Sequence, residues 1–194
     1  MPSLDTRPLE PATWGDLERL FHTKSAYGGC WCMFFRESSS EFERKQGAPN
    51  RRALKALVDA GEPTGLLAYA ADEPVGWASV APRTVYERLR RSPLLVGAHD
   101  EPGIWSLLCL YVAPEARRGG VTHTLVEAAC DHARRQGAGV LEALPRSSAR
   151  GRSAAELYVG TRRLFAAHGF AAVRGKRSSG GRVVMRRKLR SRAG

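Results

Sequence analysis

The sequence predicts a mixed α/β fold, and three consecutive stretches in the middle of the chain predict it. Residues 104–112 are an unbroken apolar run closed by Pro114, which is typical of a strand buried on both faces. After a basic loop, apolar side chains recur at helical spacing over residues 121–133, and Gly137 is suited to end that helix. Residues 140–144 are a second apolar run. The order strand, loop, helix, strand is the unit around which the other elements are placed.

Weaker patterns on both sides of this unit complete one domain, because 194 residues are enough for one sizeable core and too few for two large ones. Two strand-like runs around the turn residues 72–74 predict an antiparallel hairpin. Asn50 is expected to cap the start of a helix that ends before Gly61. In chain order, the expected elements are a strand at 6–9, helices at 13–21, 38–45 and 50–60, strands at 66–71 and 75–81, helices at 83–91 and 154–167, and strands at 171–174 and 182–188.

Composition excludes several classes of protein. No window reaches the ~18 consecutive apolar residues of a membrane span, and the first residues lack the charged and apolar blocks of a signal peptide. We therefore expect a cytoplasmic protein with no membrane partner. Of the four cysteines, Cys109 falls in the apolar strand and Cys130 on the apolar helix face, which suits reduced thiols better than a disulfide framework.

The net charge of +12 lies almost entirely in the last third of the chain. Residues 146–194 carry 14 Lys and Arg against the single acid Glu156, a net charge of +13, which leaves −1 for residues 1–145. Such a basic face fits nucleic acid, an acidic substrate or the phosphates of a cofactor. For the extreme tail we favour an ordinary solvated, arginine-rich surface, so nucleic acid is open as a partner but is not favoured.

The loop Arg117, Arg118, Gly119 and Gly120 has the chemistry of a phosphate site. It leads into a helix, so unpaired backbone N–H groups, the positive end of the helix dipole and two guanidinium groups meet at one point. No Gly-Lys-Ser/Thr follows, so this is no P-loop, and the three-glycine spacing of a dinucleotide site is absent. The alternative is a basic loop that simply caps a helix.

Three motifs in order give the chain a resemblance to the GNAT acetyltransferase superfamily. They are Val112-Ala-Pro114, Arg117-x-x-Gly120-x-Thr122 and His168-Gly169-Phe170, and the family has Gly or Ala where this chain has Thr122. The resemblance covers residues 66–188 well and the first 65 loosely. It implies a mixed, mostly antiparallel central sheet, splayed at its centre, with helices on both faces. It also implies a single acyl-CoA N-acyltransferase domain over 1–194, with 27–60 as an acceptor-side insertion and 189–194 as a basic tail.

The resemblance implies acetyl-CoA as co-substrate, with no metal, and assigns residues to it. A backbone N–H of the central strand, at Leu110 or its neighbour, would polarise the thioester carbonyl. The expected coenzyme-binding residues are Leu110, Tyr111, Val112, Arg117, Arg118, Gly119, Gly120, Val121, Thr122 and Phe165.

The aromatic stretch 27–36 is expected to line the acceptor pocket or to pack beneath it. Cys30, Trp31 and Trp77 are therefore the expected substrate-binding residues. A zinc site at Cys30-x-Cys32 is the alternative, and it is disfavoured because no second cysteine pair has ligand spacing.

The catalytic acid is where this sequence departs from the family pattern. Many relatives have a tyrosine four residues before the Gly of Gly-Phe, and here that residue is Phe165, so Tyr158 is the nearest phenol that could serve as acid. Its alternative is a tyrosine packed in the core. Glu142, a carboxylate in an apolar strand, is the candidate base, and its alternative is an ion pair with an arginine. Cys109 could be imagined as an acyl relay, but a buried structural thiol is favoured.

The function implied is acetyl-CoA dependent transfer of an acetyl group to the amine of a small molecule, directly and through a tetrahedral intermediate. Two alternatives stay open: a GNAT-like coenzyme-binding or regulatory protein, and acetylation of aminoacyl-tRNA. The identity of the acceptor amine is not predicted, and a homodimer is neither predicted nor excluded.

Overall fold

The computed structural model describes residues 3–21, 29–95, 101–148, 150–151, 153, 156–173 and 181–189, and its centre is one mixed sheet. Seven strands lie in the order β1-β2-β3-β4-β5-β7-β6. All neighbouring strands are antiparallel except β4 and β5, so the expected mixed, mostly antiparallel sheet is confirmed. The strands are β1 (Leu4–Pro8), β2 (Gly65–Ala70), β3 (Glu73–Pro82), β4 (Ile104–Val112), β5 (Val140–Ala143), β6 (Ala171–Ala172) and β7 (Met185–Lys188).

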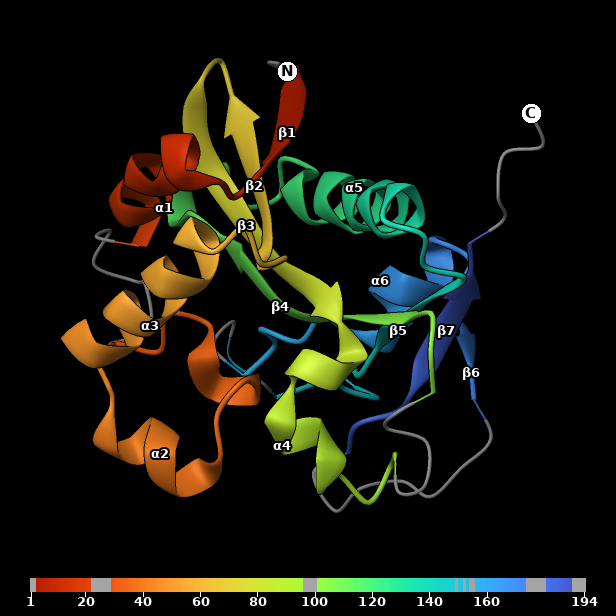
Figure 1. Cartoon of the computed structure of the whole chain (residues 1–194). Coiled ribbons are helices and arrows are strands. Elements are labelled where there is room, and N and C mark those ends of the chain that lie inside the picture. The colour runs from red at the N-terminus through yellow and green to blue at the C-terminus, as the bar shows by residue number, and fades with distance from the viewer. Residues whose placement is uncertain are drawn as a thin grey trace.

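Helices cover both faces of this sheet (Figure 1). α5 (Val121–Arg135) packs along one face against β1 to β5, and α1 (Trp14–Phe21) packs against β3 on the other face. The remaining helices are α2 (Ser39–Arg44), α3 (Ala48–Asp59), α4 (Glu87–Arg90) and α6 (Arg162–Ala167). Within the described residues, no helix has both the length and the apolar content needed to cross a membrane.

The alternation of side chains along β2 and β3 builds a separate core on each face. Ala78 and Val80 lie in the cluster under α5, whereas Trp77 lies in the cluster under α1 and α3. On β2, Leu66 faces α5 and Leu67 faces the opposite cluster. Successive residues of a strand point to opposite faces, so two apolar faces explain why these strands are mostly apolar, although β3 also holds the exposed Glu73 and the buried Ser79.

The sheet opens at its centre, between β4 and β5. These two strands pair only from Ile104 to Leu107, and β4 also carries a bulge where its register against β3 shifts after Ser79. The second half of β4 therefore has an edge that β5 does not cover. The turn that contains Tyr158 approaches this edge, and the Leu110 N–H donates to the Tyr158 carbonyl at 2.7 Å.

The helix expected over residues 154–167 is shorter than predicted. α6 begins after Thr161, whose hydroxyl caps it by accepting from the Leu164 N–H at 3.2 Å. Tyr158 lies in the turn before this cap, so the prediction that it shares a helix with Phe165 is wrong. A Thr cap was the missed signal, since its side chain competes with continued helix for the backbone donors.

The other differences are small. α3 begins at Ala48 with Gly47 as its cap, so Asn50 is not the N-cap. Its buried amide instead donates to the Gly29 carbonyl at 3.0 Å and ties α3 to the aromatic segment. The helix expected at 83–91 is divided into a 3₁₀ turn and α4. Of the expected strand at 171–174, residue 174 lies outside the described residues, as do residues 190–194 of the tail.

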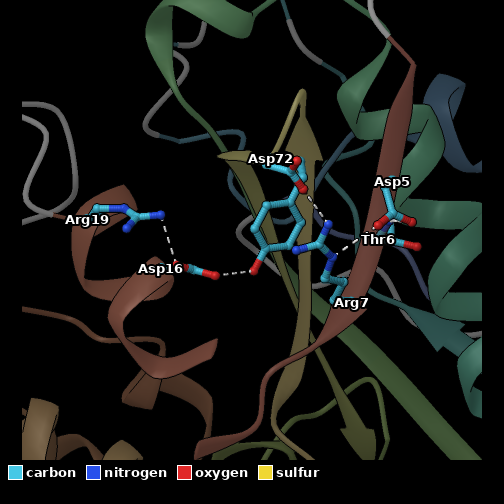
Figure 2. A network of polar contacts seen from close by, with 7 residues as sticks. Asp5, Thr6, Arg7, Asp16, Arg19 and Asp72 are labelled. Atoms are coloured by element: carbon cyan, nitrogen blue, oxygen red, sulfur yellow. Dashed lines mark hydrogen bonds and ion pairs between the residues drawn. The ribbon is translucent and has the colours of Figure 1, made fainter. Parts of the chain in front are cut away.

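A polar network holds the N-terminal edge of the sheet together (Figure 2). The Arg7 guanidinium binds Asp5 and, at 2.7 Å, Asp72 in the β2–β3 turn, and it lies 4.3 Å from the centre of the Tyr69 ring. The Tyr69 hydroxyl donates to Asp16 of α1 at 2.7 Å. The network connects β1, β2 and α1, and none of these residues lines the cavity described next.

Candidate active site

A cavity of about 1440 Å³ lies where the sheet opens. Its walls come from five parts of the chain: the end of α1, the aromatic segment with α2, the second half of β4, the loop into α5, and residue 153 with the segment from Leu157 to α6. The lining residues are Phe21, Gly29, Cys30, Trp31, Cys32, Phe34, Phe42, Gln46, Cys109, Leu110, Tyr111, Val112, Ala116, Arg117, Arg118, Gly120, Val121, Thr122, His123, Ser153, Leu157, Tyr158, Gly160, Thr161, Arg163, Leu164 and Ala167.

One end of the cavity is built to hold an anion. Arg118 has φ +66° and Gly120 has φ +84°, and α5 begins directly after Gly120 with no side-chain cap. Among the described residues, the N–H groups of Gly120, Val121 and Thr122 have no acceptor, while Arg117 and Arg118 stand beside them. Successive N–H groups in this conformation, at the positive end of a helix, form a concave anion site.

Gly120 is the position where this site is most sensitive to a side chain. Its φ of +84° is strained for any residue with a Cβ, and a Cβ built there would meet no atom within 4 Å. Because Gly120 lines the cavity, such a side chain would enter the space where an anion would lie. Gly119 does not line the cavity, and its N–H donates to the Ala116 carbonyl at 3.3 Å.

A histidine pair at the same end was missed from the sequence. His123 lines the cavity, and its Nδ1 lies 2.9 Å from Nε2 of His168. Nδ1 of His168 lies 2.6 Å from Glu127, which also binds Arg187 at 3.0 Å. Since a carboxylate only accepts, His168 donates to Glu127, and its other nitrogen then accepts from His123 when His168 is neutral. The spacing of four between His123 and Glu127 on α5 was the available signal.

The opposite end of the cavity is aromatic. Six rings line it in two groups: Phe21, Trp31 and Tyr111, and Phe34, Phe42 and Tyr158. Within each group the rings meet edge to face, with centroids 5.4 Å apart for Phe21 and Trp31 and 5.3 Å apart for Phe34 and Phe42. Edge-to-face pairs hold rings in fixed orientation, so this wall is preorganised.

Cys30, Cys32 and Cys109 also line the cavity. The thiols of Cys32 and Cys109 are 3.4 Å apart, and the Trp77 indole N–H donates to the Cys32 sulfur at 3.0 Å. Trp31 and Cys32 have φ values of +46° and +53°, a left-handed turn that sets the two side chains against the wall. No group of three metal-binding side chains is found among the residues described here.

Of the expected acceptor residues, the cavity brings Cys30 and Trp31 together but not Trp77. Trp77 is fully buried and does not line the cavity, but it contacts two residues that do: its indole N–H donates to Cys32, and its ring meets Phe21 edge to face. The strand alternation of β3 places it in the core under α1 and α3.

Cys30 should be almost unreactive in the native protein. Burial raises the pKa of its thiol to about 12, and the thiolate is the species that reacts. We expect iodoacetamide at pH 8 to modify Cys30 more than about a hundredfold more slowly in the folded than in the urea-unfolded chain. Peptide mass spectrometry over time measures both rates. Equal rates would show that the segment opens readily or that the thiol is ionised.

Of the remaining expected catalytic and coenzyme-binding residues, some line the cavity and others are buried in the core. Tyr158 lines the cavity, and its hydroxyl accepts from Arg182 at 2.8 Å. Phe165 is fully buried beneath Gly160, packs edge to face on Phe170 and does not line the cavity. Glu142 is also fully buried and lies outside the lining.

The neighbours of Glu142 explain its burial. It accepts from Arg186 at 2.8 Å and from the fully buried Arg83 at 3.2 Å, and both arginines also approach Glu101. The ion pair weighed as the alternative is therefore present. A carboxylate held between two guanidinium groups, away from the cavity, is poorly placed to accept a substrate proton.

Comparison with known proteins agrees with this geometry. The model of the acetyltransferase (GNAT) family matches residues 31–170, which is more than half of the chain. No curated protein matches the chain.

Solved structures share the fold. A GNAT-family protein from Desulfovibrio desulfuricans is 17% identical with TM-score 0.58, over 97% of this chain and 100% of that one. The yncA protein of Salmonella typhimurium, solved with its cofactor acetyl-CoA, is 17% identical with TM-score 0.55, over 98% and 96%. A ribosomal-protein-alanine N-acetyltransferase from Brucella melitensis is 21% identical with TM-score 0.55, over 95% and 99%. The chain described here therefore belongs to the acetyltransferase (GNAT) family and is an N-acetyltransferase of that type.

Proposed function

We propose that this chain transfers the acetyl group of acetyl-CoA to the amine of a small molecule within the cavity at the sheet opening. The observation that carries the proposal is that one continuous cavity joins an anion site, at Arg117 to Thr122, to an aromatic wall. A donor with phosphates at one end and a thioester at the other fits that arrangement. The cavity volume of about 1440 Å³ exceeds the ~300–1000 Å³ of an ordinary ligand pocket, which suits two ligands.

The residues present fit the coenzyme. Free N–H groups at the start of α5, with Arg117 and Arg118, would hold the pyrophosphate, and His123 and Arg163 add cationic or hydrogen-bonding groups along the same wall. When bound, the coenzyme supplies the activated acetyl group. Everything else that the reaction needs, namely orientation, a donor for the carbonyl oxygen and a proton for sulfur, falls to this chain.

The β4 edge supplies the carbonyl donor. The Leu110 N–H already donates to the Tyr158 carbonyl, so it is free for a substrate only if that bond is exchanged. Val112 is two residues further, so its N–H points the same way as that of Leu110, and it lines the cavity. Its carbonyl accepts from Arg117 at 3.3 Å, which fixes the local backbone. We therefore assign the polarising N–H to Val112 in preference to Leu110.

Tyr158 is the proton donor in this proposal. Burial raises the pKa of its phenol more than the adjacent Arg182 lowers it, so the group stays protonated through neutral pH. Because a raised pKa keeps the acid form, activity that depends on this proton should persist at neutral pH and fall only above the usual tyrosine value of about 10.

Replacing Tyr158 by phenylalanine tests that role. General acids contribute about 10²-fold or more, so we expect Tyr158→Phe to lower kcat at least about a hundredfold with little change in coenzyme affinity. Tyr111→Phe, the same change on another ring of the cavity, is the matched control and should lower kcat much less. Steady-state thiol release measures both variants. An unchanged kcat in Tyr158→Phe would assign the proton to water or to another group.

Acetyl transfer itself is tested with the wild-type protein. We expect acetyl-CoA to raise the melting temperature, and amines to release one thiol per acetylated amine, with tRNA giving neither effect. Stabilisation by tRNA together with absence of thiol release from every amine would overturn the proposal in favour of a nucleic-acid function.

A further inference from the structure

We propose that the acceptor is an arylamine, a primary amine attached directly to an aromatic ring and neutral at physiological pH. The inference rests on the proposed function and narrows it to a chemical class. Three features of the acceptor end carry it: the rings, a described lining without carboxylates, and the arginines that lie over the rings of Phe34, Phe42 and Tyr158.

The aromatic rings of the lining offer contacts that suit a flat aromatic ligand. Trp31 stacks on Trp14 at 6.0 Å and meets Phe21 at 66°, so its orientation is fixed from two sides. In the second group, Phe34 and Tyr158 meet at 80° with centroids 6.2 Å apart. Such walls offer apolar area and ring edges, which a flat aromatic ligand matches by offset or edge-to-face contacts.

None of the described residues that line the cavity is Asp or Glu. Residues 22–28, which follow Phe21 of the lining in sequence, also contain no Asp or Glu. The charged side chains that do line the cavity are Arg117, Arg118 and Arg163. A polyamine or aminoglycoside would enter as a cation, and the described lining offers it no carboxylate that would compensate its desolvation.

Aromatic rings can replace carboxylates in cation binding, but here arginines of the chain already occupy ring faces. The Arg88 guanidinium lies 4.0 Å from the Phe34 centroid and 5.8 Å from that of Phe42. The Arg182 guanidinium lies 5.7 Å from the Tyr158 centroid and donates to its hydroxyl. In the group Phe34, Phe42 and Tyr158, a second cation would meet these positive charges rather than free π density. The electrostatic field around these three rings therefore favours a neutral acceptor.

A neutral acceptor also removes the need for a base. An alkylamine resembles lysine, with a pKa of about 10.4, so only about one molecule in 2500 is neutral at pH 7. An arylamine is neutral there. Its nitrogen forms the bond to the acetyl carbon, the C–S bond breaks with its electron pair on sulfur, and the proton lost from nitrogen passes to water while sulfur gains one. This matches a cavity in which the candidate base, Glu142, is sealed between Arg83 and Arg186.

The test compares amines that differ in basicity but not in ring size. With saturating acetyl-CoA and the wild-type chain, we expect kcat/KM for 4-methoxyaniline to stay within about twofold between pH 6 and pH 8. For benzylamine it should rise about tenfold per pH unit, following the neutral fraction, and at pH 7 it should be at least about tenfold lower. Spermidine should release no thiol above background.

Two variants test whether residues of the cavity set the preference for arylamines. Gln46→Glu places one carboxylate on the wall with almost no change in shape, and should raise the benzylamine to 4-methoxyaniline ratio of kcat/KM at least about threefold. Trp31→Ala should raise the KM for 4-methoxyaniline at least about tenfold with coenzyme-induced stabilisation retained, and Trp31→Phe should restore most of it. If Trp31→Ala does not fold, the benzylamine to 4-methoxyaniline ratio of kcat/KM in Gln46→Glu still tests the inference, and an unchanged ratio contradicts it.

The outcomes distinguish failure of the arylamine inference from failure of the proposed acetyl transfer. Turnover of spermidine or benzylamine in preference to 4-methoxyaniline, with acetyl-CoA stabilisation intact, overturns the arylamine inference and leaves acetyl transfer standing. An acidic limb on the arylamine profile, at a pH where the arylamine is neutral, overturns it as well by revealing a protein base. Absence of stabilisation by acetyl-CoA overturns the proposed function, and the acceptor inference with it.

Discussion

Replacing Gly120 by valine should abolish stabilisation by acetyl-CoA. The Cβ would enter the open space above the start of α5, where the coenzyme phosphates would approach the N–H groups of residues 120–122. In addition, φ of +84° disfavours a β-branched residue, so the backbone that presents these N–H groups would distort. Loss of a charge-assisted site of this kind should weaken coenzyme affinity at least about a hundredfold, as measured by calorimetric titration.

Gly137→Val is the matched control for strain. Gly137 has φ +83° and nothing within 4 Å of a built Cβ, and it lies at the other end of α5, outside the cavity lining. It should lose a similar amount of folding stability while keeping coenzyme affinity. Equal affinity in Gly120→Val and the wild type would place the coenzyme phosphates elsewhere.

Removing Glu142 should be the most damaging change to stability. Glu142→Ala would remove the carboxylate that the fully buried Arg83 guanidinium contacts at 3.2 Å. Breaking a buried pair by removing one partner costs about 3–5 kcal/mol, because the other charge is left uncompensated. Urea denaturation with a linear fit measures the loss.

The exposed Glu115→Ala, which has no described ion pair, is the control and should change stability by no more than about 0.5 kcal/mol. A stable Glu142→Ala that loses the acidic limb of the kcat/KM profile would contradict this account. It would return Glu142 to the role of catalytic base.

The central part of the fold could be predicted from strong local patterns in the sequence. Residues 104–112 form β4 as expected, because a run with eight apolar residues of nine can be buried only between layers on both faces. The φ values of Gly120 and Gly137, at the two ends of α5, are those that the turn chemistry predicts. The opening of the sheet came from the family resemblance, since pairing between distant strands leaves no local signal.

The site was predicted less completely, because its members meet only in three dimensions. Glu142 was chosen as a carboxylate in an apolar strand and Phe165 by its spacing from Gly169, but both are buried in the core. Trp77 is one layer below the cavity. His123 and His168 lie 45 residues apart, and their contact depends on how α6 docks against α5. Neither Arg88 nor Arg182 could be assigned to a ring face from sequence.

A single titration tests the claim that one cavity holds both donor and acceptor. The probe is coenzyme A joined through an acetyl linker on its sulfur to the nitrogen of 4-methoxyaniline. If both ends occupy the same cavity, linking them makes the second contact intramolecular, so the conjugate should bind one per chain and at least about a hundredfold more tightly than coenzyme A. Trp31→Ala should remove most of that gain, and Gly120→Val should remove binding. A conjugate that binds no more tightly than coenzyme A would contradict the account.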